Sequence, residues 1–234
     1  QKASEGAALW ARPRSEITPE QYAEFYRTIA SQFDEPALTI HWRAEGRYEF
    51  DALAFIPGSR PFDLFNPERK GRSRLYVRRV LVSTEADLLP PWLRFVTLVV
   101  DSADVPLNVS REIVQKSPVL GAIRKAVVGR MIQELTKLAD SDPAKFAEVW
   151  KNFGVVLKEG LYEEPERRDA LFALARFTTS THGAGDRTLA QYVADLRPNQ
   201  TAIYYLTGAD AATIAASPHL EGFRARGIEV LLLS

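Results

Sequence analysis

Residues 95–115 read FVTLVVDSADVPLNVSREIVQ, in which a short apolar run is followed by a polar segment and then by the start of a helical pattern. The run FVTLVV is typical of a buried strand. Ser110 can act as the N-cap of a short helix. Arg111 then lies at the N-terminal end of this helix, where the helix dipole disfavours a positive charge. Arg111 is then a solvated surface residue, a member of a structural ion pair, or a charge that faces a phosphate, with Gln115 one turn later on the same face.

The residues around this stretch predict an α/β layer over about residues 10–140. Thr18 and Gln21 form a capping box around Pro19 and begin a helix. A long helix is predicted to start at Ser117-Pro118. Four strands are predicted from apolar runs rich in β-branched and aromatic residues, at 38–44, 48–56, 74–82 and 95–100, and the first two should form a hairpin.

The rest of the chain predicts a helical part that is followed by a small α/β part. One helix begins at Asp142-Pro143 and is expected to end at Gly154, because glycine often terminates helices. A second helical segment follows. The last part reads β-α-β, so its two strands, 201–207 and 228–233, are expected to lie parallel in one small sheet.

The composition excludes several classes of function. Lys+Arg and Asp+Glu both number 30, so the formal net charge of +0 gives no global field that favours nucleic acid or an anionic membrane. The absence of cysteine excludes disulfides, thiolate metal sites and cysteine nucleophiles. No apolar run is long enough for a membrane helix. The sequence contains neither of the glycine-rich phosphate-binding patterns G-x-x-x-x-G-K-[ST] and G-x-G-x-x-G. Its 3 histidines lack the spacing of metal ligands.

Two basic or apolar features remain to be explained. Arg78 and Arg79 fall inside the predicted strand 74–82, where neighbouring side chains point to opposite faces, so one of them should need a carboxylate or an anionic ligand. A structural ion pair is the commoner answer. The loop 60–74 places aromatic residues beside a basic cluster, and such a loop either docks on its own domain or forms an exposed binding surface.

Long motifs along the chain resemble the ninety-kilodalton heat-shock protein chaperones, and particularly their bacterial form. In the first half these are LWARPRSEIT (9–18), EFYRTIA (24–30), FIPGSRPFDLF (55–65), LYVRRVLV (75–82), PPWLRFV (90–96) and DSADVPLNVSREIVQ (101–115). In the second half they are IRKAVVGRMI (123–132), WKNFGVVLKEG (150–160), IYYLTG (203–208) and SPHLEGFRARGIEVLLLS (217–234). Because the chain starts without methionine and both ends look cut, we expect it to be the middle segment of such a chaperone.

The resemblance implies an α/β fold class with three parts. A larger α/β sandwich domain, related to the second domain of ribosomal protein S5, would cover 1–140. A helical connector would cover 141–175, and a smaller α/β domain with a short parallel sheet would cover 176–234. ATP with Mg²⁺ would be bound mainly by an N-terminal domain outside this chain, and dimerisation would belong to a C-terminal domain.

The resemblance also implies roles for residues of the opening stretch. The pattern P-L-N-x-S-R-E maps the arginine that the family supplies to the γ-phosphate of ATP onto Arg111, its supporting glutamine onto Gln115, and the positioning loop onto Asn108 and Ser110. Arg78 matches a second arginine near the contact with the N-terminal domain. An arginine fork fits phosphate oxygens and stays charged. The full-length protein would be an ATPase, whereas the segment alone would be inactive and hold no cofactor.

The last implication is a surface for unfolded or partly folded client proteins. The resemblance places client contacts at Phe33, Phe62, Leu64, Phe65, Trp150 and Phe153. By spacing alone Trp150 and Phe153 belong to a core-facing helical stripe, so both interpretations stay open.

The resemblance also indicates the expected partners and the competing hypotheses. Expected partners are the N-terminal ATPase domain, clients and co-chaperones, in a cytoplasmic homodimer that binds no nucleic acid and no membrane. The alternatives are a client-binding module without a catalytic role and, by fold analogy, an RNA binder.

Overall fold

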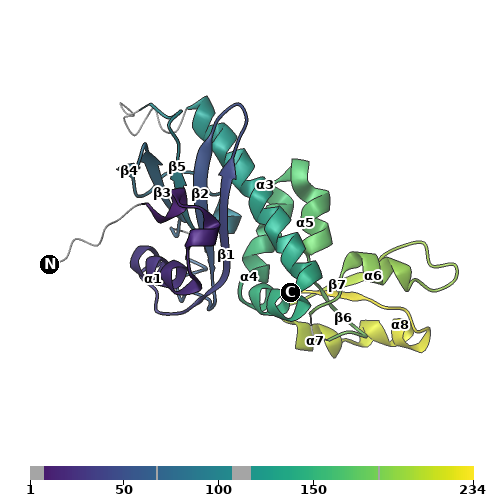
Figure 1. The fold of residues 1–234 in the computed structure, drawn as a ribbon. Coiled ribbons are helices and arrows are strands. Elements are labelled where there is room, and N and C mark those ends of the chain that lie inside the picture. The colour runs from purple at the N-terminus through teal and green to yellow at the C-terminus, as the bar shows by residue number, and fades with distance from the viewer. Residues whose placement is uncertain (1–7, 67, 107–116, 184) are drawn as a thin grey trace. The chain divides into compact units, whose positions relative to one another are not determined.

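The computed structural model describes residues 8–66, 68–106, 117–183 and 185–234. The chain divides into two compact units, Gln1–Lys145 and Phe146–Ser234, and each unit combines helices with a β-sheet (Figure 1). The α/β class predicted from the sequence is therefore confirmed. The finer division at 140 and 175 stays a prediction.

Five strands form the sheet of the first unit, in the order β1-β2-β5-β3-β4. β3 and β5 are parallel, and the other neighbours are antiparallel. β1 and β2 form the predicted hairpin. The bounds are β1 Pro36–Ala44, β2 Phe50–Pro57, β3 Arg72–Val77, β4 Val80–Ser83 and β5 Thr97–Asp101. The central strands β2 and β5 are buried on both faces, and the apolar run FVTLVV predicted this for β5.

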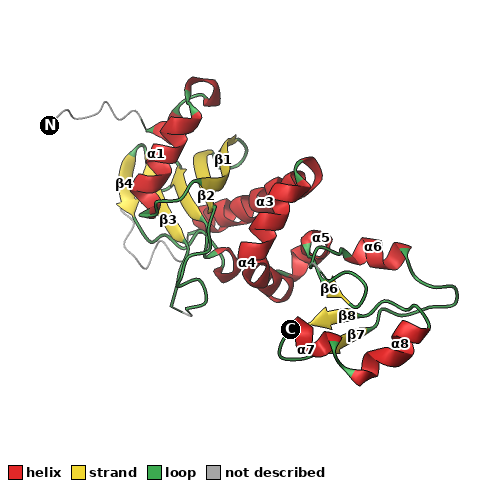
Figure 2. Ribbon diagram, turned by 90° about the horizontal axis from the view of Figure 1, so that it is seen from below, coloured by secondary structure: helices red, strands yellow, loops and turns green. Residues whose placement is uncertain are grey.

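The helices of this unit cover the two faces of the sheet. Figures 1 and 2 show α1, Pro19–Ala30, on one side and α3, Pro118–Ser141, on the other. α1 begins at the predicted capping box, in which the Gln21 amide donates to Thr18 Oγ1 at 3.3 Å and the Thr18 amide donates to Gln21 Oε1 at 3.0 Å. The face of α1 packs with Trp10 against Leu53, Phe55 and Val99 of the sheet. This cluster holds the N-terminal segment onto β2 and β5.

The predicted strand 74–82 is wrong in one respect, because the chain turns back at Arg78 and Arg79. Both residues have positive φ, 50° and 67°, and Val77 pairs with Val80 across the turn. A two-residue hairpin loop favours positive φ at both positions, which normally selects Asn or Gly. Arginine has no such preference for positive φ, so the turn could not be predicted from the sequence. Both side chains are exposed, and neither faces a covered side of the sheet.

The second unit has a three-stranded sheet in the order β6-β8-β7. β7 and β8 are parallel, as the β-α-β pattern predicts, and β6 is antiparallel to β8. The strands are β6 Thr178–Thr179, β7 Tyr205–Thr207 and β8 Leu231–Leu233. The helices are α4 Pro143–Glu163, which starts in the first unit, α5 Arg168–Leu174, α6 Leu189–Ala194, α7 Ala211–Ala215 and α8 Glu221–Ala225. β7 begins later than predicted, and α4 does not end at Gly154.

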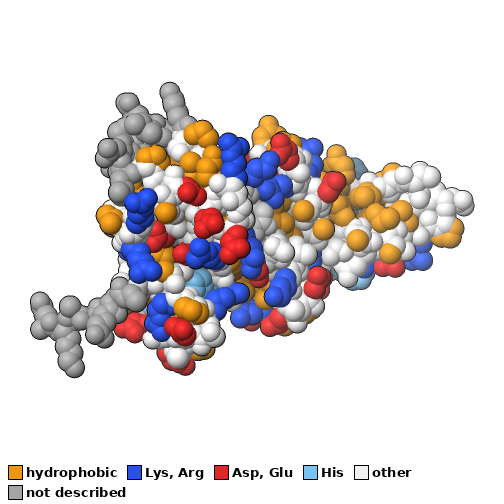
Figure 3. All heavy atoms as spheres, turned by 45° about the horizontal axis from the view of Figure 1, so that its top comes forward, with side chains coloured by type: hydrophobic (Ala, Val, Ile, Leu, Met, Phe, Trp, Pro, Cys, Tyr) orange, Lys and Arg blue, Asp and Glu red, His pale blue; other side chains and the backbone are white. Residues whose placement is uncertain are grey.

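The balanced composition leaves the arrangement of charges on the surface open. On the face that Figure 3 displays, basic and acidic side chains are interspersed over the described residues. Within the described ranges, no helix is both long and apolar enough to cross a membrane.

Candidate functional site

Three phenylalanine side chains of the first unit are presented to solvent. Phe33 follows α1, and Phe62 and Phe65 lie in the loop after β2. Phe33 and Phe62 are fully exposed, and Phe65 is 51% exposed with the Arg60 guanidinium 5.6 Å from its ring centroid. An exposed aromatic side chain contributes apolar area that a binding partner can cover. We call these three residues the aromatic surface.

The two loops that carry the aromatic surface are bonded to each other. The Asp34 carboxylate accepts hydrogen bonds from the amide of Ser59 at 2.9 Å and from its hydroxyl at 3.0 Å. The other oxygen of Asp34 accepts from the hydroxyl of buried Tyr26 at 3.0 Å. A Cβ at Gly58 would lie 2.4 Å from the carbonyl oxygen of Glu35, so only glycine permits this approach. The loops are therefore fixed beside one another before any partner arrives.

Leu64 does not belong to the aromatic surface, which corrects the expectation from the sequence. Its side chain is fully buried, and its carbonyl accepts a hydrogen bond from Arg94 Nε at 2.9 Å. Arg69 forms an ion pair with Asp63 in the same loop, and burial lowers the pKa of the Arg69 guanidinium while Asp63 opposes that shift. The buried Leu64 side chain anchors the loop, whereas its apolar neighbours Phe62 and Phe65 are exposed.

The turn that carries Arg78 is held by a buried carboxylate at the end of β5. Asp101 Oδ2 accepts hydrogen bonds from the Trp10 indole at 3.0 Å and from the Arg79 amide at 3.1 Å. The carboxylate thereby stabilises two adjacent left-handed residues, each of which is disfavoured by side-chain sterics. Among the described residues, Arg78 and Arg79 have no carboxylate within ion-pair distance. Asn108, Ser110, Arg111 and Gln115, the other predicted residues of this region, lie outside the described residues.

A neutral histidine supports Trp10 from the other side. His41 Nε2 lies 2.8 Å from the Trp10 carbonyl, which can only accept, so Nε2 carries the proton. Nδ1 then accepts from the Tyr22 hydroxyl at 2.7 Å. Burial lowers the pKa of His41, although its hydrogen bond to Trp10 opposes that shift. His41 therefore has a structural role.

The two predicted residues of α4 have different environments. Phe153 is fully buried, as the core-facing interpretation of its spacing predicts, and its side chain offers no surface for the client contact that the resemblance implies. Trp150 is partly buried and stacks on Phe146 with the ring centroids 6.0 Å apart. A Cβ at Gly154 would lie 2.8 Å from the Trp150 ring, which shows that this glycine provides space for the indole inside a continuous helix. Trp150 thus combines a core contact with an accessible face.

Several residues that organise these sites were missed from the sequence. Asp34 and Ser59 tie two loops that lie 25 positions apart, and Asp101 joins an indole 91 positions away, so no local pattern indicated them. Within the described ranges, no group of three or more histidine, cysteine or acidic residues could hold a metal ion.

Comparison with solved structures defines the class of the protein. The fold matches the middle domain of a heat shock protein from Plasmodium falciparum, with a TM-score of 0.82 and 28% sequence identity, over 95% of this chain and 87% of that one. The segment is thus a heat-shock-protein middle domain. The chain belongs to the Hsp90 family, whose model, described as Hsp90 protein, matches residues 1–234.

Two bacterial relatives illustrate the similarity. The chaperone protein HtpG of Mesorhizobium japonicum is 60% identical over 231 residues, which are 99% of this chain and 37% of the relative. The chaperone protein HtpG of Azorhizobium caulinodans is 60% identical over 234 residues, which are 98% of this chain and 37% of the relative. The chain therefore spans about a third of the length of the curated relatives it matches.

Proposed function

We propose that this chain is the middle segment of an ATP-dependent molecular chaperone of the cytoplasm. In this proposal it offers the aromatic surface to unfolded or partly folded proteins and supplies Arg111 to the γ-phosphate of ATP. The observation that carries the proposal is the exposure of Phe33, Phe62 and Phe65 on two loops that are bonded to each other. The membership of the Hsp90 family supplies the context in which such a surface has a use.

The aromatic surface suits chains that have lost their native packing. Unfolded proteins expose apolar side chains, and burying each of these against an aromatic ring removes apolar area from water. The contact is non-directional, so it does not require one particular partner sequence. Because the Asp34–Ser59 contact holds the loops in place, little ordering of the surface is needed when a client binds.

Arg111 is proposed as the residue that contacts the γ-phosphate, with Gln115 as its support and with Asn108 and Ser110 in the loop that positions it. ATP with Mg²⁺ would be held mainly by another domain of the same protein and would supply the phosphoryl group. The β3–β4 turn offers further hydrogen-bond donors for phosphate oxygens. Arg78 and Arg79 expose two guanidinium groups there, and neither has a carboxylate partner among the described residues. Arginine can donate two parallel hydrogen bonds to phosphate oxygens and offset the charge that develops on them.

The partners follow from the same proposal. They are the N-terminal ATPase domain, client proteins and co-chaperones, in a homodimer that forms through a C-terminal domain. The balanced charge of the chain gives no general attraction to nucleic acid.

Replacement of Arg111 tests the catalytic half of the proposal. In a full-length protein that carries this segment, we expect Arg111→Ala to lower kcat for ATP hydrolysis by at least about tenfold and to leave the Kd for ATP unchanged, since arginines in this role contribute about 10³–10⁵ elsewhere. Arg111→Lys should restore little, because lysine lacks the planar fork. Arg226→Ala, an exposed arginine of the second unit, is the matched control.

The contrary outcome of this experiment favours the second candidate. If Arg111→Ala hydrolyses ATP at the wild-type rate while it still binds nucleotide, the segment is a client-binding module without a direct catalytic role. The aromatic surface is the observation that keeps this candidate open, because it does not depend on Arg111.

A further inference from the structure

Asp101 is the last residue of β5, and its buried carboxylate joins segments that are far apart in the sequence. Oδ2 accepts hydrogen bonds from the Trp10 indole at 3.0 Å and from the Arg79 amide at 3.1 Å, and Oδ1 lies 3.3 Å from the same amide. Trp10 belongs to the segment before α1, and Arg79 belongs to the turn between β3 and β4. The carboxylate thus holds the N-terminal segment and this turn at the end of β5.

The charge of this carboxylate has no cationic partner among the described residues. The guanidinium groups of the nearby Arg78 and Arg79 are exposed, and only the backbone amide of Arg79 is bonded to Asp101. Burial of a charge is costly, and two neutral N–H donors offset only part of that cost. The stability of the fold alone therefore does not account for a carboxylate at this position.

The turn that Asp101 holds is unfavourable for arginine. Arg78 and Arg79 have positive φ angles of 50° and 67°, which the Cβ of an ordinary side chain disfavours. A hydrogen bond to a carboxylate is stronger than one to a neutral acceptor, so the bond from the Arg79 amide can stabilise this conformation. Without it, we expect the turn to relax and both guanidinium groups to change position.

The residues that follow Asp101 are also bonded to their neighbours. The Ser102 amide donates to the Tyr76 carbonyl at 3.1 Å, and the Ser102 hydroxyl donates to the Glu49 carbonyl at 2.7 Å. The Glu49 amide in turn donates to Asp104 Oδ2 at 2.8 Å. These bonds tie the end of β5 to β3 and to the segment that enters β2. The carboxylate therefore sets the position of the turn relative to the sheet.

We propose that Asp101 is a positioning residue, which sets the conformation in which the β3–β4 turn presents Arg78 and Arg79 to the phosphate groups of a nucleotide. Asp101 acts through the turn and does not itself touch the nucleotide. Donors that are held in place before the reaction stabilise developing charge without a cost of rearrangement. The inference rests on the proposed function, because it requires that this segment contacts ATP.

ATP hydrolysis by a full-length protein that carries this segment tests the proposal. Asp101→Asn keeps the shape of the side chain and one acceptor oxygen, whereas Asp101→Ala removes every bond. We expect kcat to fall by about threefold for Asn and by at least about tenfold for Ala. The Kd for ATP should stay unchanged, because another domain holds the nucleotide in the proposed function. A wild-type kcat in both variants, measured where circular dichroism shows them folded, would overturn the proposal.

A double-mutant cycle separates positioning from stabilisation. Glycine adopts positive φ without steric cost, so Arg79→Gly allows the turn to form without Asp101. We expect Asp101→Ala to lower kcat in the wild-type background and to cause no further loss beside Arg79→Gly. It should lower the temperature of thermal unfolding in both backgrounds, because the Trp10 indole loses its acceptor. An equal loss of kcat in both backgrounds would contradict positioning through the turn.

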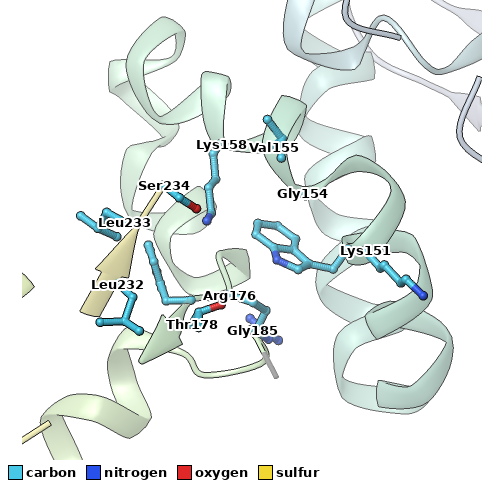
Figure 4. Close-up of a pocket in the computed structure, with 12 residues that line it drawn as sticks. Lys151, Gly154, Val155, Lys158, Arg176, Thr178, Gly185, Leu232, Leu233 and Ser234 are labelled. Atoms are coloured by element: carbon cyan, nitrogen blue, oxygen red, sulfur yellow. The ribbon is translucent and has the colours of Figure 1, made fainter. Parts of the chain in front are cut away.

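Two control variants account for the change in charge. Asp51 pairs with Asp101 across β2 and β5 and makes no hydrogen bond to the turn among the described residues, so Asp51→Ala should hydrolyse ATP as wild type does. Lys151→Ala removes a positive charge, as Arg79→Gly does, from the second unit, where Figure 4 shows the Lys151 side chain pointing outward from α4. A loss of kcat for Asp51→Ala as large as that for Asp101→Ala would overturn the role of the hydrogen bond.

Arg111→Ala, measured in the same assay, distinguishes the two ways in which the account can fail. If Arg111→Ala loses activity while Asp101→Ala keeps it, the inference about Asp101 is wrong and the proposed function stands. If both variants hydrolyse ATP at the wild-type rate, the catalytic part of the proposed function is wrong as well.

Discussion

Leu64 and its two apolar neighbours show how three residues in one loop acquire different roles. Leu64 is fully buried, while Phe62 and Phe65 are exposed. The composition of the loop predicted that it is either docked or exposed, and the structure shows that it is both. Pattern alone could not assign the residues, because the loop has no regular period and its path depends on Arg94 and Asp34, which are distant in sequence.

Substitution within this loop tests that assignment. We predict that Leu64→Ala lowers the free energy of unfolding by about 3 kcal/mol, because it leaves a cavity in the core. Phe62→Ala should change it by less than about 0.5 kcal/mol, because the side chain is exposed. Guanidinium denaturation followed by circular dichroism measures both values. A Phe62→Ala variant as unstable as Leu64→Ala would contradict the exposed position of Phe62.

At the scale of elements, α4 is longer than predicted, because a glycine inside a helix can provide space for a side chain instead of ending the helix. Gly154 was predicted to end the helix, but α4 continues to Glu163 and Gly154 makes room for the Trp150 indole. The helix starts, the β1–β2 hairpin and the parallel pair β7–β8 could be predicted, since caps and apolar periods are local. The β3–β4 turn could not, because a distant carboxylate, Asp101, stabilises it.

Two glycines in helices provide a matched comparison. Gly121→Ala in α3 should stabilise the protein by about 0.5–1 kcal/mol, because alanine favours helix and a Cβ there meets no atom within 4 Å. Gly154→Ala should lack this gain, because its Cβ would lie 2.8 Å from the Trp150 ring. Thermal unfolding gives the stabilities. In the chain labelled with 5-fluorotryptophan, the fluorine NMR resonance of Trp150 reports any displacement of its indole. An unshifted resonance together with a full gain at Gly154 would refute the contact.

At the scale of the whole molecule, a cluster of charges joins separate segments of the second unit. Glu229 Oε2 lies 3.0 Å from Arg187 Nη2, and Glu229 Oε1 accepts from the Thr179 hydroxyl at 2.6 Å. Arg187 also pairs with Asp195. Burial alone would raise the pKa of Glu229, but hydrogen bonds from Thr179, Arg187 and His182 hold it below its ordinary value. The cluster joins the loop before α6 to the segment that enters β8.

This cluster predicts how stability varies with pH. Because the folded pKa of Glu229 is depressed, its contribution is present above the unfolded value of 4.5 and is lost as pH falls through the folded pKa. Glu229→Gln should cost about 2–3 kcal/mol at pH 7, because the buried Arg187 loses one of its two charged partners. The deficit should shrink as the pH falls below 4.5. Thermal unfolding of both proteins between neutral and acid pH measures this, and a deficit that stays constant with pH would show that Glu229 does not stabilise by its charge.

The central claim is that the aromatic surface holds unfolded proteins, and suppression of aggregation by this chain tests it directly. The variant Phe33→Ser, Phe62→Ser, Phe65→Ser removes the surface. The matched control is Tyr162→Ser, Val193→Ser, Tyr205→Ser, which removes three exposed apolar side chains of the second unit. Light scattering of a thermally unfolded reporter enzyme is the measurement. We predict that wild type and control suppress scattering and that the phenylalanine variant loses most of this effect; equal suppression by all three proteins would contradict the claim.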